Sequence, residues 1–480
     1  MTDHGGKHNT EDDLRKNISS NEKLGLRPNI NQFLLLVLVN AFVGAMIGLE
    51  QTVIPLLGKE EFGVESNAFL LSFIASFGIV KAILNLFAGN LSDRWNRKKV
   101  LVLGWLFGIP VPFILLFATS WNWILFANVL LGINQGLAWS MTVNMKIDLV
   151  GKEKRGLALG LNEFAGYIAV ALVGFLTGYL AAVYGLKPFP FYLGIAFPIL
   201  GFVVSLVLVK DTTRFTQLEL EQQESNEERV TKAGRSTAAR DETINTDPEV
   251  GTNLNFKQVF FQTTWRNRSL LAASQAGLVN NMVFGVTWGL FTIYFVSFGI
   301  SVTDTSLLKA LHPGIWGFLQ LGTGPLSDSV GRKRLIYPGM IVQAIGIWTV
   351  LYTQDFYPGL IVGMSLLGIG TALVYPTLLA AISDIANPTN IKLTAVFFVF
   401  FAILENIVPP IADINPTIRV APSPPVSTKN KTTKRAPADA PIKSAAYSLP
   451  ATEANALNAA DIMIPTKKNG TEKRIINNGR

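Results

Sequence analysis

Residues 89–101 read GNLSDRWNRKKVL, and residues 324–336 read GPLSDSVGRKRLI. The two stretches lie 235 positions apart and are identical at six of thirteen positions, which hold Gly, Leu, Ser, Asp, Arg and Lys. A second pair of segments, 130–148 and 366–384, matches at nearly the same spacing. This long internal period predicts that the chain contains two repeats of one structural unit.

The sequence around these stretches is too apolar for a soluble protein. Of the 480 residues, 49% are hydrophobic and 15% are charged, and polar residues gather in 1–30, 210–266 and 412–480. The rest contains apolar runs of about 18 residues or more, which as helices match the ~30 Å hydrocarbon core of a bilayer. An ordinary soluble enzyme is therefore excluded.

The apolar runs predict an all-α polytopic membrane protein with six spans in the first half and about five in the second. The predicted spans are 32–57, 67–91, 99–119, 122–147, 157–184, 188–209, 268–298, 304–327, 335–353, 357–383 and 391–411. The predicted domains are a cytoplasmic N-terminal tail (1–30), a first bundle (31–209), a cytoplasmic linker (210–266), a second bundle (267–411) and a disordered tail (412–480). A plain solvated linker is favoured over a regulatory or partner-binding one, because the segment has no apolar periodicity.

Lys and Arg predict the orientation, because cytoplasmic loops retain them. With the N-terminus inside, the inner loops hold 26 of these residues, and the outer loops hold two, Lys59 and Lys187. Residues 1–30 show no removable signal peptide. We therefore expect a multi-pass protein of the cell (plasma) membrane with a cytoplasmic N-terminus.

The two quoted loops resemble the G-x-L-S/A-D-x-x-G-R-K/R signature that follows the second helix of each half in the Major Facilitator Superfamily. The resemblance covers roughly residues 30–390. It implies the two-bundle fold of that family and transport by alternating access, with the substrate bound between the halves. Asn96 departs from the signature, since the second copy has Gly331 there, but Asn tolerates left-handed backbone geometry and the turn is expected to survive.

Four motif residues have roles that can be predicted from their chemistry. Gly89 and Gly324 allow two helices to approach closely. Asp93 and Asp328 can accept hydrogen bonds from the N–H groups that begin a neighbouring helix and oppose its positive dipole end.

Two arginines of the motif are predicted to form ion pairs. Arg97 and Arg332 can pair with Asp148 and Asp384, which end the fourth and tenth spans. The resemblance implies that these residues, with the motif aspartates, bridge the two halves and favour the outward-open state. The alternative is that the basic cluster only sets topology.

Polar residues within the spans predict a buried polar site, because ionisable groups at membrane depth face a cavity or a partner. Lys81 lies about 18 Å deep when counted back along its helix at ~1.5 Å per residue. The candidates for substrate binding or ion coupling are Lys81, Asn134, Gln135, Asn162 and Glu163 in the first half, and Asn281, His312 and Gln320 in the second. In one hypothesis Lys81, Gln135 and Glu163 line a polar cavity in which Glu163 or Lys81 titrates. In the other, Lys81 and Glu163 form a fixed structural ion pair.

Two further ionisable residues are expected near the outer ends of spans. Glu50 lies near the outer end of the first span, and Lys309 lies near the outer end of the eighth, where a long stem can reach water. A lone histidine such as His312 is more often a hydrogen-bonded packing residue than a functional one.

Several classes of chemistry are excluded by composition. The chain has no cysteine and three histidines, so disulfides, thiolate sites and histidine metal clusters are not expected. Phosphate-binding G-x-x-x-x-G-K-[ST], H-E-x-x-H and nucleophile-elbow motifs are absent from the sequence. We therefore expect no enzyme, cofactor, metal or nucleic-acid partner. The expected partners are the lipid bilayer, a small-molecule substrate and a proton as coupling ion, and the expected state is a monomer.

The leading functional prediction is a secondary active transporter that moves a small solute across the cell membrane, coupled to protons, with efflux as one direction. Multidrug efflux is only one candidate, because Gly132 stands where proton-linked relatives often carry Arg, and the fifth span lacks a Gly-Pro-x-x-Gly-Gly pattern. Lys81 favours a second candidate, uptake of an organic anion or metabolite. A non-transporting membrane sensor or a defective paralogue is the alternative class.

The repeat fails near residue 391. RGLALGLNEFAGY (155–167) has no recognisable partner in IKLTAVFFVFFAI (391–403), and residues 412–480 hold 11 basic residues without an apolar run. With eleven spans this tail would lie outside, against the positive-inside tendency. A frameshift or truncation near 391 is favoured over a genuine disordered tail, and the loss of a helix there puts activity in doubt.

Overall fold

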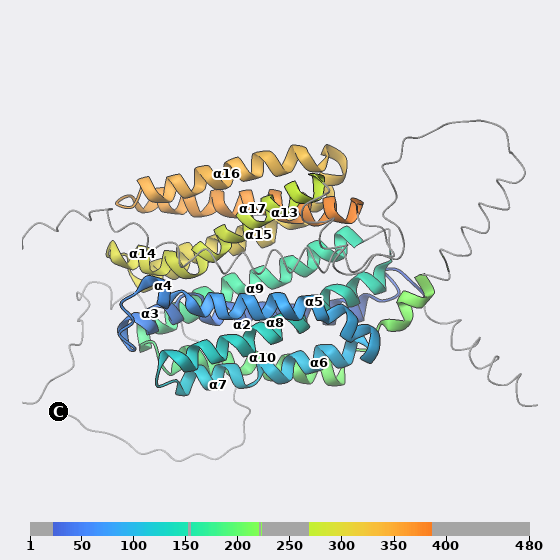
Figure 1. Cartoon of the computed structure of the whole chain (residues 1–480), viewed down its shortest axis with the longest axis horizontal. Helices are drawn as coiled ribbons and strands as arrows, with labels where there is room; N and C mark the ends of the chain where they lie inside the picture. The colour runs from blue at the N-terminus through green and yellow to red at the C-terminus, as the bar shows by residue number, and fades with distance from the viewer. Residues whose placement is uncertain (1–22, 152–154, 220–221, 223–267, 386–480) are drawn as a thin grey trace, which may run out of the picture. The chain divides into compact units, whose positions relative to one another are not determined.

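A computed structural model describes residues 23–151, 155–219, 222 and 268–385, which belong to one compact unit, Met1–Ile418. Figure 1 shows these residues as long helices that run alongside one another. Three predicted segments lie outside the described residues: the linker from residue 223 onward, the eleventh span (391–411) and the tail (412–480).

The first half follows the predicted order of spans. Its helices are α2 (Ile30–Gln51) with α3 (Val53–Glu60), α4 (Asn67–Leu70), α5 (Ser72–Trp95), α6 (Arg97–Gly108) with α7 (Pro110–Phe117), α8 (Trp121–Val150), α9 (Arg155–Tyr184) and α10 (Phe189–Val207). The break between α2 and α3 has a local cause. Pro55 has no N–H to donate to the carbonyl of Gln51 four residues earlier, so the helix ladder is interrupted there.

The second half repeats this pattern with one irregular helix. Its elements are α13 (Arg268–Gly285), the π-helical turn η3 (Val286–Leu290), α14 (Phe291–Ser297), α15 (Val302–Val330), α16 (Arg332–Tyr352) and α17 (Tyr357–Ile385). Below, the end where α5 meets α6 and α10 stops is called the linker end, and the opposite end, which holds α3 and α14, is called the distal end.

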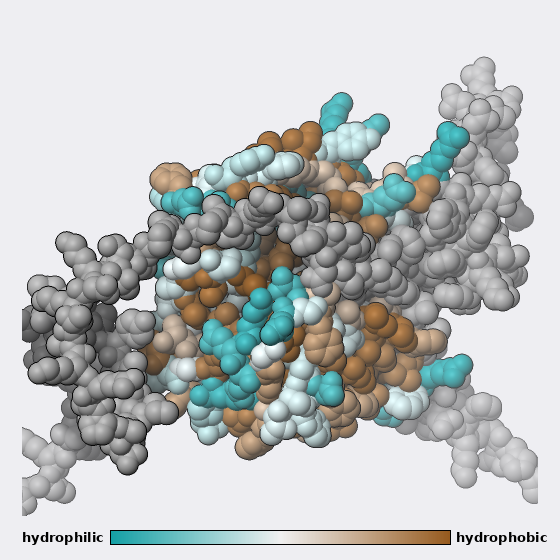
Figure 2. Space-filling model, turned by 60° about the vertical axis from the view of Figure 1, so that its left-hand side comes forward, coloured by the Kyte–Doolittle hydropathy of each residue, from teal (hydrophilic) through white to brown (hydrophobic). Residues whose placement is uncertain are grey.

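The predicted all-α membrane architecture is confirmed. Within the described residues, eight helical segments are long and apolar enough to cross a membrane, and the helix segment Ser72–Asn85 is a shorter apolar one. Figure 2 shows large brown, hydrophobic areas on the surface of the described helices. Among the described residues, the side chains of Phe117, Leu172 and Tyr352 are more than half exposed. Apolar side chains on an outer surface suit contact with lipid rather than water.

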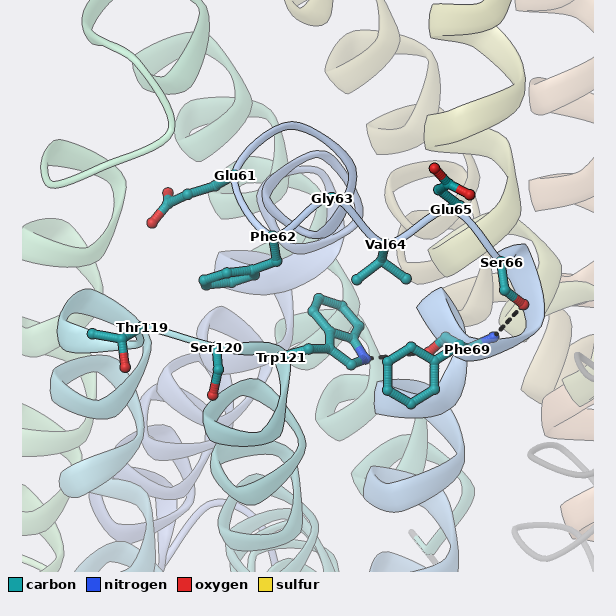
Figure 3. Close-up of a pocket in the computed structure, with 10 residues that line it drawn as sticks. All are labelled: Glu61, Phe62, Gly63, Val64, Glu65, Ser66, Phe69, Thr119, Ser120 and Trp121. Carbon is teal, nitrogen blue, oxygen red and sulfur yellow. Dashed lines mark hydrogen bonds between the residues drawn. The ribbon is translucent and has the colours of Figure 1, made fainter.

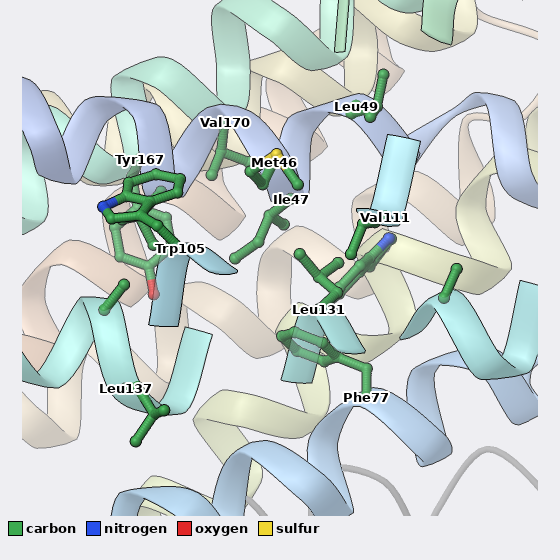
Figure 4. Packing of buried hydrophobic residues seen from close by; sticks show 14 of the residues in the cluster. Met46, Ile47, Leu49, Phe77, Trp105, Val111, Leu131, Leu137, Tyr167 and Val170 are labelled. Atoms are coloured by element: carbon green, nitrogen blue, oxygen red, sulfur yellow. The ribbon is translucent and has the colours of Figure 1, made fainter. Parts of the chain in front are cut away.

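Glycines bring α2 and α9 into close contact. A Cβ added at Gly44 would lie 2.1 Å from the carbonyl oxygen of Gly166, and one at Gly48 would lie 2.7 Å from that of Val170. Backbone-to-backbone packing of this kind is how membrane helices gain van der Waals contact in the absence of a hydrophobic driving force. Figure 4 shows Met46 and Ile47 of α2 packed near Val170 of α9.

The two motif glycines do not pack in this way, which corrects the expectation from the sequence. A Cβ added at Gly89 or Gly324 would meet no atom of the described structure within 4 Å. Both lie toward the linker end, where α5 and α15 present these positions to open space. In the described part of the chain, the close approaches occur at other glycines.

The turn after each motif helix is confirmed. Asn96 has a φ of 90° and Gly331 a φ of 99°, so both copies reverse direction through the same positive-φ geometry. The Asn96 side chain also accepts a hydrogen bond from the Lys99 N–H at 2.9 Å, which caps the start of α6.

The two halves contact each other along α9 and α15. Small residues line this contact. A Cβ added at Gly178 would lie 2.3 Å from Ser306, and a Cβ added at Gly317 would lie 3.1 Å from Tyr167. Gly314 lies opposite Ala171 at 3.4 Å by the same measure. The contact therefore runs from the distal end toward the middle of both helices.

Candidate functional site

Arg97 and Asp148 meet at the linker end of the first half, as predicted. The Arg97 Nε donates to Asp148 Oδ2, and Nη2 donates to Oδ1 at 3.2 Å. Hydroxyls of Thr212 and Thr216, just after α10, donate to the same carboxylate at 2.7 and 3.1 Å. The start of the linker is thus attached to the bundle through this ion pair. Because both charged residues belong to the first half, the pair does not bridge the halves, and its gating role stays a prediction.

In the second copy of the motif, the arginine contacts the motif aspartate. Arg332 Nη1 lies 2.5 Å from Asp328 Oδ1 and also donates to Ser327 Oγ. The Asp328 carboxylate therefore contacts the arginine of its own motif, whereas the sequence predicted a contact with a helix N-terminus. A residue four positions along the chain is within easy reach of its side chain. The side chains of Asp93 and Asp384 lie outside the described residues, so their contacts stay predictions.

Glu163 lies at the centre of a buried polar cluster in the first half. Its Oε1 accepts hydrogen bonds from Trp139 Nε1 at 3.1 Å and Asn162 Nδ2 at 2.8 Å, while Oε2 has no hydrogen-bond partner. The Lys81 ammonium lies 5.7 Å from the centroid of the same Trp139 ring and 5.4 Å from that of Phe77. The structure thus brings three predicted site residues together around one tryptophan.

Four members of this cluster, Trp139 among them, were missed from the sequence. Asn40 donates to the Asn162 carbonyl at 2.7 Å, and Thr142 donates to Asn40 Oδ1 at 2.8 Å. Lys146, at the end of the predicted span 122–147, is fully buried and donates to the Leu36 carbonyl at 3.0 Å. The available signal was the spacing of Trp139, Thr142 and Lys146, which places them on one face of α8.

Asn134 and Gln135 are buried but turn toward different helices. Asn134 Nδ2 donates to the Gly104 carbonyl of α6 at 3.0 Å, and Gln135 Nε2 donates to the Val43 carbonyl of α2 at 2.8 Å. The Gln135 Oε1 atom has no hydrogen-bond partner. Asn134 therefore ties α8 to α6, and Gln135 faces the side on which α2 packs.

His312 stands in a chain of hydrogen bonds that joins five helical elements of the second half. Its Nδ1 lies 3.2 Å from Thr287 Oγ1, and its Nε2 lies 3.1 Å from Thr371 Oγ1. Gln343 Nε2 then donates to Thr371 at 2.8 Å and to Asn280 Oδ1 at 2.7 Å. The chain connects η3, α15, α17, α16 and, through Asn280, α13.

The proton count of this chain depends on two hydroxyl groups. Thr287 donates to the Phe284 carbonyl and Thr371 to the Leu367 carbonyl, each at 2.8 Å. A hydroxyl has one proton, so in this arrangement both contacts to His312 require the ring nitrogens to donate. A neutral ring needs one threonine hydroxyl to turn toward it.

Aromatic rings connect the halves beside these clusters. Tyr167 of α9 lies against Trp316 of α15, with ring centroids 3.5 Å apart, and Trp316 also contacts Phe284 at 5.8 Å. Gln320, one turn further along α15, is fully buried, and both of its amide atoms lack a hydrogen-bond partner. The neighbouring candidate Asn281 is half-buried on α13. Buried amide atoms without partners are costly, which suits a surface that binds a polar solute.

Lys309 corrects another expectation, because its side chain does not reach water. It is 2% exposed, and its ammonium donates to the carbonyls of Gln51 and Trp288 and to Thr292 Oγ1. Glu50, next to Gln51 on α2, is also fully buried. Both residues lie between helices at the distal end.

A pocket of about 580 Å³ opens at the distal end of the first half (Figure 3). Segment 61–66 and Phe69 form one side, and Thr119, Ser120 and Trp121 form the other. Trp121 Nε1 donates to the Phe69 carbonyl at 3.2 Å, which fixes the indole across the pocket. None of the predicted site residues lines it.

Buried acids, amides and lysines between apolar helices of two repeated halves define a polytopic membrane transporter. The sequence profile of the Major Facilitator Superfamily matches residues 33–412, and the chain belongs to that superfamily. It is therefore a secondary transporter that acts on a small molecule in a lipid bilayer.

Individual relatives are distant. The chain is 24% identical over 382 residues to the multi-drug resistance efflux pump PmrA of Streptococcus pneumoniae, covering 78% of this chain and 86% of that protein. It is 24% identical over 372 residues to a probable 4-methylmuconolactone transporter of Cupriavidus pinatubonensis, covering 72% of each. A crystal structure of a D-xylose–proton symporter aligns with a TM-score of 0.57 at 18% identity, covering 79% of this chain and 88% of that one, which shows the shared fold.

Proposed function

We propose that this protein is a proton-coupled transporter of the plasma membrane that exports a small organic solute, with Glu163 as the residue that binds the coupling proton. One observation carries the proposal: Glu163 is 3% exposed, and its Oε2 has no hydrogen-bond partner while Oε1 has two. A buried carboxyl oxygen without a donor is where an added proton is best accommodated.

Trp139 gives this site a connection to the substrate. Its indole N–H holds Glu163, its ring faces the Lys81 ammonium, and its ring centroid lies 5.5 Å from that of Tyr167. Tyr167 in turn contacts Trp316 of the second half. A solute that displaces these rings therefore acts on the hydrogen bond to Glu163, which links solute binding to proton binding.

Two observations bear on the direction of transport. The likeness to an efflux pump favours export, whereas Lys81, a cation over two aromatic rings, supports uptake of an organic anion as the second candidate. A cytoplasmic N-terminus, a monomeric state and the absence of enzyme activity belong to the same proposal. A sensor without flux, or a defective paralogue, is the competing class.

Solute flux in proteoliposomes with an imposed pH gradient tests the proposal. The candidate solutes are first selected by their ability to raise the melting temperature of the purified protein. Glu163→Gln is expected to bind the same solutes and exchange them between the two sides, yet lose flux driven by the gradient. Glu65→Gln, an exposed acid at the distal end, is the matched control and is expected to keep gradient-driven flux.

Three outcomes count against the proposal. Unchanged gradient-driven flux in Glu163→Gln would show that Glu163 does not couple protons to transport. Solute accumulation inside right-side-out vesicles would show uptake rather than export. No flux of any stabilising solute in the unsubstituted protein favours the non-transporting class.

A further inference from the structure

The Lys309 ammonium is held by three oxygen atoms that come from both halves. Gln51 of α2 supplies a backbone carbonyl from the first half, and Trp288 and Thr292 supply a carbonyl and a hydroxyl from the second. An ammonium has three N–H donors, so these three acceptors match its hydrogen-bonding capacity. Thr292 also donates to the Gln51 carbonyl at 3.2 Å.

Both carbonyls lie beside irregularities in their helices. The intrahelical partner of the Gln51 carbonyl would be the N–H of residue 55, and Pro55 has none. Trp288 lies inside η3, where the π-helical turn changes the hydrogen-bond pattern of the backbone. The two breaks face each other across the halves, and the ammonium lies between them.

The surroundings of this contact exclude water. Lys309 is 2% exposed, Trp288 and Thr292 are fully buried, and Ser306, one turn earlier on α15, lies against Gly178 of α9. Removing one acceptor from a buried cation costs more than breaking a surface hydrogen bond, because no water replaces it.

We propose that Lys309 is the lock that keeps the distal end closed between the two halves. Separation of α2 from α15 takes the Gln51 carbonyl away from the ammonium, so the closed state gains a charged hydrogen bond that the open state lacks. The inference rests on alternating access in the proposed function, since this end must open once in each cycle. It assigns a positioning role to Lys309 and requires neither a particular solute nor proton coupling.

Thiol accessibility tests the lock without measuring transport. The chain has no cysteine, so Ser306→Cys introduces a single thiol at a position that is buried when the distal end is closed. The rate at which a membrane-impermeant maleimide labels this thiol, in sealed vesicles of both orientations, reports opening at the distal end.

Lys309→Met in this background removes the donors and keeps an apolar side chain of similar length. We expect labelling to become about tenfold faster, since a charged hydrogen bond contributes at least about a factor of ten to an equilibrium. Lys187→Met is the matched control. Lys187 also lies at the distal end but pairs with Glu61 of its own half, so labelling should keep the rate of the parent.

A second pair of variants covers the case in which Lys309→Met fails to reach the membrane. Thr292→Val removes one acceptor of the ammonium, whereas Thr292→Ser retains it. Faster labelling in the valine variant alone supports the lock. Equal labelling in Lys309→Met and the parent, or in both Thr292 variants, overturns it. Because no solute is added, this result is independent of whether Glu163 couples protons.

Discussion

Arg97 and Asp148 are joined by two hydrogen bonds at the linker end of the first half, and the pair is nearly buried, with side chains 11% and 7% exposed. Its counterpart in sequence, Arg332, contacts Asp328, whose side chain is 64% exposed. The Arg97–Asp148 pair is therefore more buried than the Arg332–Asp328 pair, and the two pairs should contribute differently to stability.

Asp148→Asn is expected to lower the free energy of unfolding by about 3 kcal/mol, because it leaves the Arg97 guanidinium buried without its counter-charge. Asp328→Asn is expected to cost less than about 1 kcal/mol, since an exposed ion pair is screened by water. Melting of the purified variants in detergent measures both. Equal losses would mean that burial does not distinguish the two pairs.

Gly44→Ala is expected to destabilise the protein by about 1–3 kcal/mol, because the added methyl group would overlap the Gly166 carbonyl and force α2 away from α9. Gly89→Ala is the matched substitution at a position where a Cβ meets no described atom, and its melting temperature should stay within the error of the parent. If Gly89→Ala melts lower than Gly44→Ala, the packing described for these helices is wrong.

Asn96→Val is expected to cost about 1–2 kcal/mol, because a β-branched residue is strained at a φ of 90°. Asn96→Gly should be nearly neutral, because two effects offset each other. Glycine adopts this φ without strain, but it loses the side-chain cap to the Lys99 N–H. Thermal melting of the two variants is again the measurement. A valine variant as stable as the glycine variant would show that the turn is not constrained.

The sequence predicted much of this fold because membrane spans leave a strong signal. Apolar runs of bilayer length and the repeated motif located the helices of the described residues, eight of which are long and apolar enough to cross a membrane, and the positive φ at Asn96 was expected from its alignment with Gly331. The irregular features were harder to predict. The π-helical turn at Val286–Leu290 was not predicted, because no local pattern of the sequence marks it.

The site was predicted in part for a similar reason. Lys81 and Glu163 are charges within apolar runs, so their position inside the bundle could be predicted from composition. Lys146 lies near the end of α8, and only the three-dimensional contact with α2 shows that it points inward. The surroundings of Lys309 likewise required the positions of Gln51 and Trp288, which are distant in sequence.

The small residues between α9 and α15 have a mechanical consequence. Gly314 and Gly317, near the middle of α15, let the backbones of the two helices approach closely, so little side-chain packing must change at these two positions when the helices tilt against each other. We expect these two positions to stay in contact while the linker end and the distal end, where Gly178 meets Ser306, open in turn.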